Sequence, residues 1–266
     1  MSDFLKTMAT NSAARAAAVS SSFTASDFDK PVLPLNLGAF DVIAEIKNRS
    51  PAEGDLSYGD SDLNSRARAY AAGGAVAISV LTEPSRFDGD LAHLEEVVAA
   101  VPNTPVMRKD FLVEPLQILE ARKAGASGVL LILAMLSDAK LREMLDCAWE
   151  HGLFVLLESF DEDDLRRTSA LLENPVDHDK AEGGHMLVGV NTRNLRTLAV
   201  DADRLRKLAS ILPKASCVAE SGLLVPADAA RVAAWGYRMA LVGSALMRSK
   251  DPAALITAMR DAGGAA

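Results

Sequence analysis

Short apolar runs alternate with longer helical patterns along most of the chain. Eight runs are rich in apolar side chains, namely residues 42–46, 75–81, 105–108, 128–132, 154–157, 186–190, 217–219 and 239–242. Most of them are continuously apolar and do not alternate between apolar and polar positions, which is typical of parallel strands buried on both faces. The pattern therefore predicts eight buried strands.

Helical patterns follow these runs, at residues 91–101, 115–124, 139–150, 163–172, 202–212, 227–235 and 252–261. Their starts carry helix signals: Ser137 and Asp161 suit N-caps, while Pro115, Pro226 and Pro252 suit a first helical turn. Eight strands that are each followed by a helix are typical of a closed parallel barrel. We therefore predict an α/β fold of the (β/α)8 TIM-barrel class.

Two segments lie outside this alternation. Residues 1–41 contain an Ala-rich helical pattern at 4–19, which predicts a short N-terminal helical extension that either caps the barrel or frays. Residues 42–266 are then expected to form the (β/α)8 barrel, which would be the catalytic domain if the chain is an enzyme. The irregular stretch 173–185 resembles an insertion and is predicted to be a solvated loop.

Polar side chains follow several of the predicted strands at the point where each strand ends. They are Lys47, Lys109, Glu158, Asn191 and Glu220. Ligands of parallel α/β proteins bind at the carboxyl ends of the strands, so repeated polar groups there indicate one shared active site.

Glu45 and Lys47 are two residues apart, so both side chains are expected to point into the barrel. An interior salt bridge is the alternative, but desolvation makes such a pair a poor stabiliser unless it also contacts a ligand. Lys109 is expected at the mouth with Phe111 nearby, where neighbouring cations or burial would lower its pKa and suit it to act as a general acid. The alternative is a solvated lysine paired with Asp110.

Glu158 ends a buried strand, so burial is expected to raise its pKa and suit it to proton transfer; a role as a helix cap is the alternative. Asn191 and Arg193 stand two apart at the next strand end, although an ordinary turn has a similar composition. An arginine fork matches a carboxylate or phosphate, and an amide orients a hydroxyl.

Glycines and serines follow the seventh and eighth strands, at Ser221, Gly222, Gly243 and Ser244. In TIM barrels these two loops, with the N-terminus of a short extra helix, commonly bind phosphate through backbone N–H groups. Together with Lys47 they predict a phosphate site.

Composition narrows the possible partners. The net charge of −8 and the pI near 5.1 argue against a nucleic-acid partner, whereas Lys47, Lys109 and Arg193 allow a cationic mouth for a small anion. No apolar stretch resembles a signal or membrane-spanning segment, so we expect a cytoplasmic protein. The two cysteines lie far apart in sequence, so we expect free thiols. We expect the protein to be a monomer or a weak homo-oligomer. None of the four histidines ends a strand and no nucleotide-binding motif is present, so we expect no metal and no cofactor.

The chain resembles indole-3-glycerol phosphate synthases, the (β/α)8 enzymes of tryptophan biosynthesis. The resemblance rests on an ordered series of segments: residues 43–47 with Ser50 and Pro51, 70–75, 79–82, 108–111, 117–122, 130–132, 189–195 and 219–222. It implies a cofactor-free carboxy-lyase that converts 1-(2-carboxyphenylamino)-1-deoxyribulose 5-phosphate to indole-3-glycerol phosphate, with loss of carbon dioxide and water.

The resemblance also implies residue roles. Lys109 would be the general acid, Glu158 the general base, and Lys47, oriented by Glu45, would bind acidic groups and assist proton transfer. The remaining positions would bind substrate: Asn191, Arg193 and Glu220 its polar groups, Phe87 and Phe111 its aromatic ring, and Ser50, Ser221, Gly222, Gly243 and Ser244 its phosphate.

Three other functions remain open at this point. Glu53 and the 173–185 segment are unusual for the family and suggest a divergent paralogue that acts on another aryl-amine sugar phosphate. A phosphoribosyl isomerase would favour a strand-end Cys or Asp pair where this chain has Lys and Glu. A catalytically weak anion-binding barrel would have no reason to bury so many polar groups.

Overall fold

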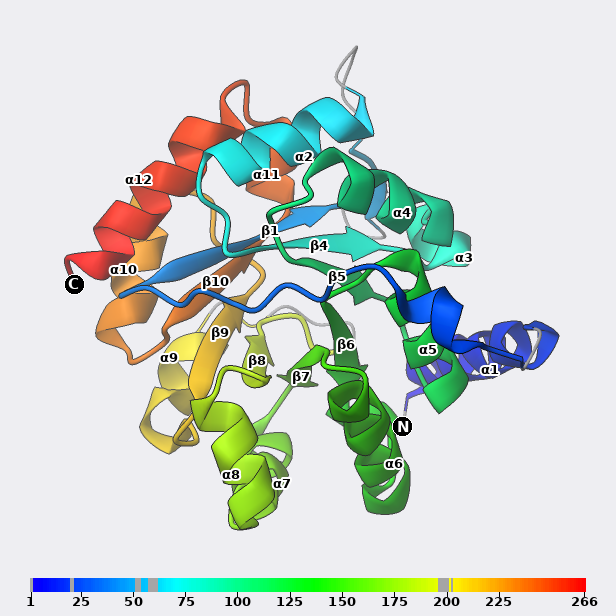
Figure 1. Cartoon of the computed structure of the whole chain (residues 1–266). Helices are drawn as coiled ribbons and strands as arrows, with labels where there is room; N and C mark the ends of the chain where they lie inside the picture. Colours follow the sequence, from blue (N-terminus) through cyan, green and yellow to red (C-terminus); the bar gives the residue numbers. More distant parts are fainter. Residues whose placement is uncertain (1, 20–21, 51–53, 57–61, 196–200, 202) are drawn as a thin grey trace.

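The computed structural model describes residues 2–19, 22–50, 54–56, 62–195, 201 and 203–266. Within these residues eight parallel strands close into a barrel in the order β1-β10-β9-β8-β7-β6-β5-β4 (Figure 1). They are β1 (Asp41–Ile46), β4 (Ala77–Leu81), β5 (Val106–Lys109), β6 (Gly128–Ile132), β7 (Phe154–Ser159), β8 (Met186–Asn191), β9 (Ser216–Glu220) and β10 (Met239–Val242). The predicted (β/α)8 fold is confirmed, and each predicted strand overlaps an observed one.

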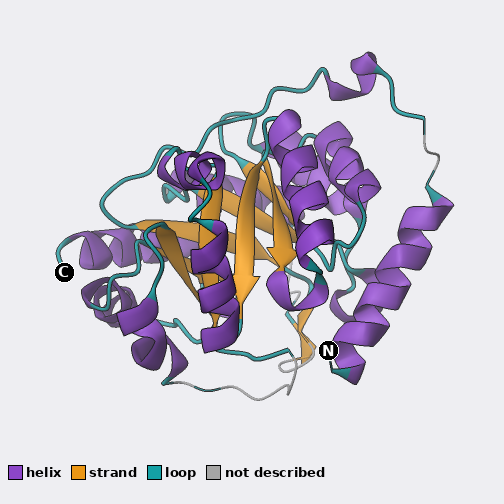
Figure 2. Ribbon diagram, turned by 90° about the horizontal axis from the view of Figure 1, so that it is seen from below, coloured by secondary structure: helices purple, strands orange, loops and turns teal. Residues whose placement is uncertain are grey.

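Parallel register decides which side chains face the barrel interior. Glu45 of β1 pairs with Ser79 of β4, Glu158 of β7 with Gly189 of β8, and Asn191 of β8 with Glu220 of β9. Partners in a parallel ladder point to the same face of the sheet. The polar strand ends therefore converge on one end of the barrel, where the strand arrows point in Figure 2.

Helices surround the strands as an outer ring (Figure 1). They are α2 (Leu63–Ala72), α3 (Pro84–Phe87), α4 (Leu91–Ala100), α5 (Pro115–Ala124), α6 (Asp138–Glu150), α7 (Glu162–Leu171), α8 (Pro175–Glu182), α9 (Arg204–Leu208), α10 (Pro226–Ala234), α11 (Ser244–Arg248) and α12 (Pro252–Gly264). The described chain also contains three 3₁₀ turns, at Ala25–Phe28, Leu133–Met135 and Ala209–Ile211, and a hairpin of two short strands, β2 (Arg49–Ser50) and β3 (Gly54–Asp55). The helix predicted at 202–212 is observed as α9 followed by a 3₁₀ turn at Ala209–Ile211.

The predicted N-terminal helix is present as α1 (Asp3–Ala18), which lies to one side of the outer ring. The hydroxyl of Ser2 caps its first turn by accepting from the N–H of Leu5 at 3.3 Å. Leu5, Met8, Ser12 and Ala16 recur at helical spacing and are buried, so they form the packed face of the helix. The helix is therefore docked against the barrel along its length.

The prediction of a solvated loop at residues 173–185 was wrong, because the segment contains α8. Asn174 accepts from the N–H of Val176 at 2.9 Å and Pro175 begins the helix, which are standard start signals that the surrounding Asp, His and Gly residues concealed. Asp177 is only 1% exposed and accepts two hydrogen bonds from Nη1 of Arg142 on α6, at 2.7 and 3.0 Å. This ion pair joins α8 to α6.

Both cysteines are free thiols, as predicted. Burial raises the pKa of Cys147 to about 11 and that of Cys217 to about 12, so both thiols stay protonated and unreactive at neutral pH. None of the helices that the structure describes is long and apolar enough to cross a membrane.

Candidate active site

A cavity of about 470 Å³ opens at the carboxyl ends of the strands. Its volume is that of a typical small-molecule site. The lining includes most of the predicted residues, namely Glu45, Lys47, Phe87, Lys109, Phe111, Glu158, Asn191, Arg193, Ser221, Gly243 and Ser244. One cavity therefore collects side chains from most of the barrel strands and the loops that follow them.

The floor of this cavity is a chain of ion pairs. Glu45 lies between two lysines, with its Oε1 2.7 Å from Nζ of Lys47 and its Oε2 3.0 Å from Nζ of Lys109. Lys109 Nζ also lies 3.4 Å from Oε2 of Glu220, whose side chain is fully buried. The predicted inward direction of Glu45 and Lys47 is confirmed, and their salt bridge is part of the cavity wall.

Burial and neighbouring charges have opposite effects on the pKa values of Glu45 and Lys109. Burial disfavours ionisation of Glu45, but the charges of Lys109 and Lys47 prevail and lower its pKa to about 2. Burial likewise disfavours the charged form of Lys109, yet Glu45, Glu220 and Glu158 prevail and raise its pKa. The expectation of a lowered Lys109 pKa was therefore wrong, because sequence did not reveal three carboxyl groups around one ammonium.

Glu158 differs from Glu45 because no lysine lies within ion-pair distance of it in the described part of the chain. Burial raises its pKa, and the neighbouring Glu220 raises it further. The alternative of a helix cap does not hold, since Asp161 caps α7 by accepting from the N–H of Asp164 at 3.1 Å. Glu158 is thus a carboxyl group that holds its proton more tightly than an ordinary glutamic acid, as the sequence predicted.

The predicted phosphate side lies at the ends of β8, β9 and β10. Asn191 Oδ1 accepts from the backbone N–H of Arg193 at 2.9 Å and from the hydroxyl of Ser221 at 2.8 Å, which joins two strand ends. Ser244 begins α11, the short helix that directly follows β10. Helix N-termini attract anions, so this corner suits a phosphate group.

Two of the predicted phosphate residues are not placed at the cavity wall. Gly222 lies in the loop after β9, with a φ of 79° that favours glycine, but it is not among the lining residues. Ser50 belongs to β2, and its side chain lies outside the described residues, as do Pro51 and Glu53.

An aromatic wall covers one side of the cavity, and sequence reasoning identified only part of it. The rings of Phe87 and Phe111 lie 6.2 Å apart between centroids, and Phe4 of α1 packs edge-on against Phe111 at 5.9 Å. Leu130 and Ile132 line the same cavity from β6. Phe4 was missed because nothing in an Ala-rich N-terminal helix shows where it docks; Leu130 and Ile132 were detectable from their two-residue spacing.

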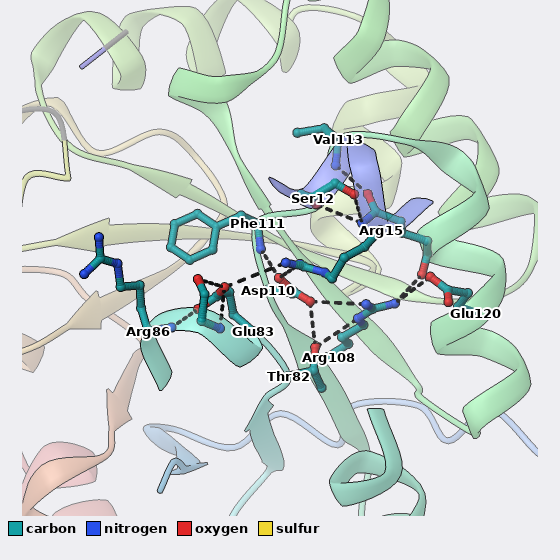
Figure 3. A network of polar contacts seen from close by, with 12 residues as sticks. Ser12, Arg15, Thr82, Glu83, Arg86, Arg108, Asp110, Phe111, Val113 and Glu120 are labelled. Atoms are coloured by element: carbon teal, nitrogen blue, oxygen red, sulfur yellow. Dashed lines mark hydrogen bonds and ion pairs between the residues drawn. The ribbon is translucent and has the colours of Figure 1, made fainter. Parts of the chain in front are cut away.

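A network of polar contacts joins α1 to the segment that carries Lys109 and Phe111 (Figure 3). Arg15 Nη2 donates to Oδ1 of Asp110 at 2.6 Å, and Arg15 Nη1 lies 3.7 Å from Glu83. On its other oxygen Asp110 accepts from the hydroxyl of Thr82 at 2.9 Å and from Arg108 at 3.2 Å. Asp110 therefore does not pair with Lys109, as the alternative interpretation required, but anchors the N-terminal helix.

One group of possible metal ligands is found among the described residues. His178, Asp179 and Glu182 lie on the surface of α8, which leads into the amino end of β8, opposite the cavity. The group has no connection with the cavity described above.

The family assignment comes from sequence comparison. Residues 6–259 match the family model described as indole-3-glycerol phosphate synthase. The chain belongs to the indole-3-glycerol phosphate synthase family. A relative of that name from Nocardioides sp. is 47% identical over 237 residues, covering 88% of this chain and 86% of the relative. Another from Azospirillum brasilense is 46% identical, covering 84% of this chain and 80% of the relative.

Solved structures agree on the fold. The 3-hexulose-6-phosphate synthase from Salmonella typhimurium superposes with a TM-score of 0.62 at 17% identity, covering 84% of this chain and 98% of that one. The tryptophan synthase subunit alpha from Legionella pneumophila gives a TM-score of 0.57, also at 17% identity, covering 85% of this chain and 94% of that one. At such low identity these likenesses support the barrel alone.

Proposed function

We propose that this chain is a carboxy-lyase that converts 1-(2-carboxyphenylamino)-1-deoxyribulose 5-phosphate to indole-3-glycerol phosphate, carbon dioxide and water. Its family membership supports the reaction, and the cavity supports the substrate class. The substrate has an aromatic ring at one end and a phosphate at the other. The cavity has an aromatic wall of Phe4, Phe87 and Phe111 at one side and the β8 to β10 strand ends at another.

Ring closure requires a proton donor at the ketone oxygen of the substrate, because attack by the aromatic ring leaves negative charge on that oxygen. Lys109 carries an ammonium whose pKa is raised by its carboxylate neighbours, so it is present in the charged, donating form at neutral pH. We assign Lys109 this role, and we assign loss of carbon dioxide to the step in which the ring regains its aromaticity.

Dehydration requires removal of one proton and departure of one hydroxyl group as water. We assign Glu158 as the base for the proton and Lys109, reprotonated from solvent after ring closure, as the donor to the departing hydroxyl. The raised pKa of Glu158 makes its ionised form a stronger base than an ordinary carboxylate. Lys47, held 2.7 Å from Glu45, is assigned to the substrate's acidic groups, and Glu45 orients both lysines.

The phosphate is assigned to the corner formed by Ser221, Gly243 and Ser244, with Ser50 and Gly222 retained as sequence-based assignments. Arg193 and Asn191 stand beside this corner and suit the phosphate and the hydroxyl groups of the sugar chain. Glu220, expected from the sequence to contact the substrate, is fully buried and is not among the residues that line the cavity. Its Oε2 lies 3.4 Å from Nζ of Lys109, so we assign it to hold that ammonium in position.

The observation that carries this proposal is the placement of Lys109 between Glu45 and Glu220 on the floor of an aromatic-walled cavity. The test is the indole fluorescence that appears when purified protein is mixed with 1-(2-carboxyphenylamino)-1-deoxyribulose 5-phosphate without added metal or cofactor. A rise at catalytic protein concentration supports the proposal. Folded protein that binds the compound without a rise would favour a divergent paralogue or a binding barrel.

The proposal extends to the partners of the chain. We infer a small phosphorylated substrate, because the net charge of −8 opposes binding to nucleic acid while Lys47, Lys109 and Arg193 supply local positive charge. A monomer or weak homo-oligomer in the cytoplasm remains the predicted state, to be checked by sedimentation and cell fractionation.

A further inference from the structure

Gly189 occupies the inner face of β8, where it pairs with Glu158 on one side and with Val218 of β9 on the other. A Cβ atom added at Gly189 would overlap Oε1 of Glu220 and would approach Cδ1 of Leu156 to 3.3 Å. The space that any other residue would fill with its side chain is therefore occupied by the carboxyl group of Glu220.

Glu220 has a definite position in this space. It is fully buried, its Oε2 lies 3.4 Å from Nζ of Lys109, and its charge is one of the two main reasons for the raised pKa of Glu158. The charged groups around Glu158 and Glu220 are Glu45 and Lys47 from β1, Lys109 from β5, and Arg86, Asp110 and Arg193 at the cavity rim. Glu220 thus contacts the proposed acid and influences the proposed base.

We propose that Gly189 is a positioning residue for the reaction. Because Gly189 has no side chain, the Glu220 carboxyl group can occupy the space next to β8 and lie beside both Lys109 and Glu158. This inference deepens the proposed function and rests on it. Gly189 touches neither reacting atom and acts through Glu220.

The same arrangement recurs on another strand end. A Cβ at Gly243, directly after β10, would overlap Oε1 of Glu45 and would lie 2.9 Å from Nζ of Lys47. The carboxyl group of Glu220 therefore lies in the space left by Gly189, and that of Glu45 lies in the space left by Gly243. Close packing leaves no other space for a methyl group, so either glycine is replaced only if a carboxyl group moves.

The first test is Gly189→Ala, with kcat, KM and the pH dependence of kcat/KM measured beside the wild type. The added methyl group is expected to displace Glu220 from Glu158, so that kcat falls more than tenfold. The acid limb of the profile is expected to move to lower pH, because Glu158 loses its charged neighbour. Gly128→Ala is the matched control, since its methyl group would meet the ring of Phe154 on the inner face of the barrel, away from the charged floor. That control is expected to lower thermal stability and leave the profile unchanged.

A second variant separates positioning from general damage to the barrel. Glu220→Asp shortens the side chain and vacates the space beside Gly189, so Gly189→Ala is expected to have little further effect on kcat in that background. Strong non-additivity of this kind marks residues that act through one another. Additive losses would overturn the proposal, as would a folded Gly189→Ala enzyme with unchanged kcat and pH profile.

Carboxyl titration by NMR of protein labelled with 13C-glutamate provides a readout that needs no turnover. The Glu158 resonance, identified by its absence in Glu158→Gln, is expected to titrate at lower pH in Gly189→Ala. An unmoved midpoint would overturn the positioning role. If Gly189→Ala alone folds poorly, Glu220→Asp is compared with the double variant Glu220→Asp/Gly189→Ala: a double variant that folds and keeps the kcat of Glu220→Asp supports the proposal, and one that still folds poorly or loses further kcat overturns it. Absence of wild-type turnover would instead refute the proposed function, so the two failures are distinguishable.

Discussion

Arg15 on the N-terminal helix donates a 2.6 Å hydrogen bond to Asp110, the residue that follows Lys109. The aspartate side chain is fully buried, whereas that of Arg15 is 29% exposed. Ser12 on the same helix accepts a 2.8 Å hydrogen bond from Gln117 of α5. These contacts hold α1 so that Phe4 reaches the aromatic wall, which makes the extension part of the candidate site.

Arg15→Ala is therefore expected to weaken substrate binding more than chemistry. Asp110 keeps Thr82 and Arg108 as partners, so the strand end stays in place while α1 loosens. Loss of the Phe4–Phe111 pair corresponds to about 0.5–1.5 kcal/mol, so KM should rise about two- to tenfold with kcat nearly unchanged. Steady-state kinetics at several substrate concentrations measures this split.

Arg166→Ala is the matched control for this prediction, because Arg166 forms two exposed ion pairs within α7, with Glu162 and Asp163. It should leave KM unchanged. Adding Phe4→Ala to Arg15→Ala should raise KM little beyond the larger single effect. A large fall in kcat with constant KM would contradict the assignment of α1 to substrate cover.

Lys109→Met removes the proposed acid while keeping most of its volume. Turnover should fall by about 10²- to 10⁴-fold, the usual contribution of a general acid. The loss of Lys109 also removes the charge that most favours ionised Glu45, so the pKa of Glu45 rises in the folded variant. In the wild type the lowered pKa of Glu45 contributes stability that is present above its unfolded-state pKa and is lost as pH falls. The variant loses part of this contribution, so its loss of stability relative to the wild type should be larger near pH 8 than near pH 4.

Thermal denaturation of Lys109→Met and wild type at both pH values measures that difference. If the difference in melting temperature between the variant and the wild type were the same at both pH values, the ionisation of Glu45 would not depend on Lys109. Near-normal turnover would remove Lys109 from the proposed mechanism.

Glu220→Gln should shift the acid limb of the kcat/KM profile to lower pH. Glu158 must be ionised to act as a base, and the charge of Glu220 raises its pKa; a neutral amide removes that contribution. The alkaline limb should move in the same direction, because Glu220 also raises the pKa of Lys109. A profile superimposable on that of the wild type would indicate that neither group senses Glu220.

Asp177→Ala should reduce stability and leave catalysis intact. The carboxyl group is buried and accepts two hydrogen bonds from Arg142, while Arg142 retains Asp146 at 2.9 Å. Loss of such bonds costs about 1–3 kcal/mol, which urea denaturation would measure. A clear fall in kcat in the folded variant would contradict this prediction and would mean that α8 influences the active-site end of the barrel.

Strand positions were predictable because parallel strands buried on both faces must be apolar along their length. The polar residue that ends each run was equally visible, and the structure brings Lys47, Lys109, Glu158 and Asn191 to one cavity as expected. The α8 helix was not predicted, because its cap and its first proline stand within a polar stretch that also suits a loop.

The sequence by itself determined the barrel, the strand ends that face the cavity and the family of the chain, because these depend on local patterns and on order along the chain. Closure of the barrel brings together residues that are far apart in sequence, and no local pattern predicts these contacts. Lys109 meets Glu220 across 111 positions and Asp110 meets Arg15 across 95. Charge interactions depend on distance in space and not on separation in sequence, so the raised pKa of Lys109 follows only from the tertiary structure. The same holds for the packing of Glu220 against Gly189 and for the contact of Phe4 with Phe111.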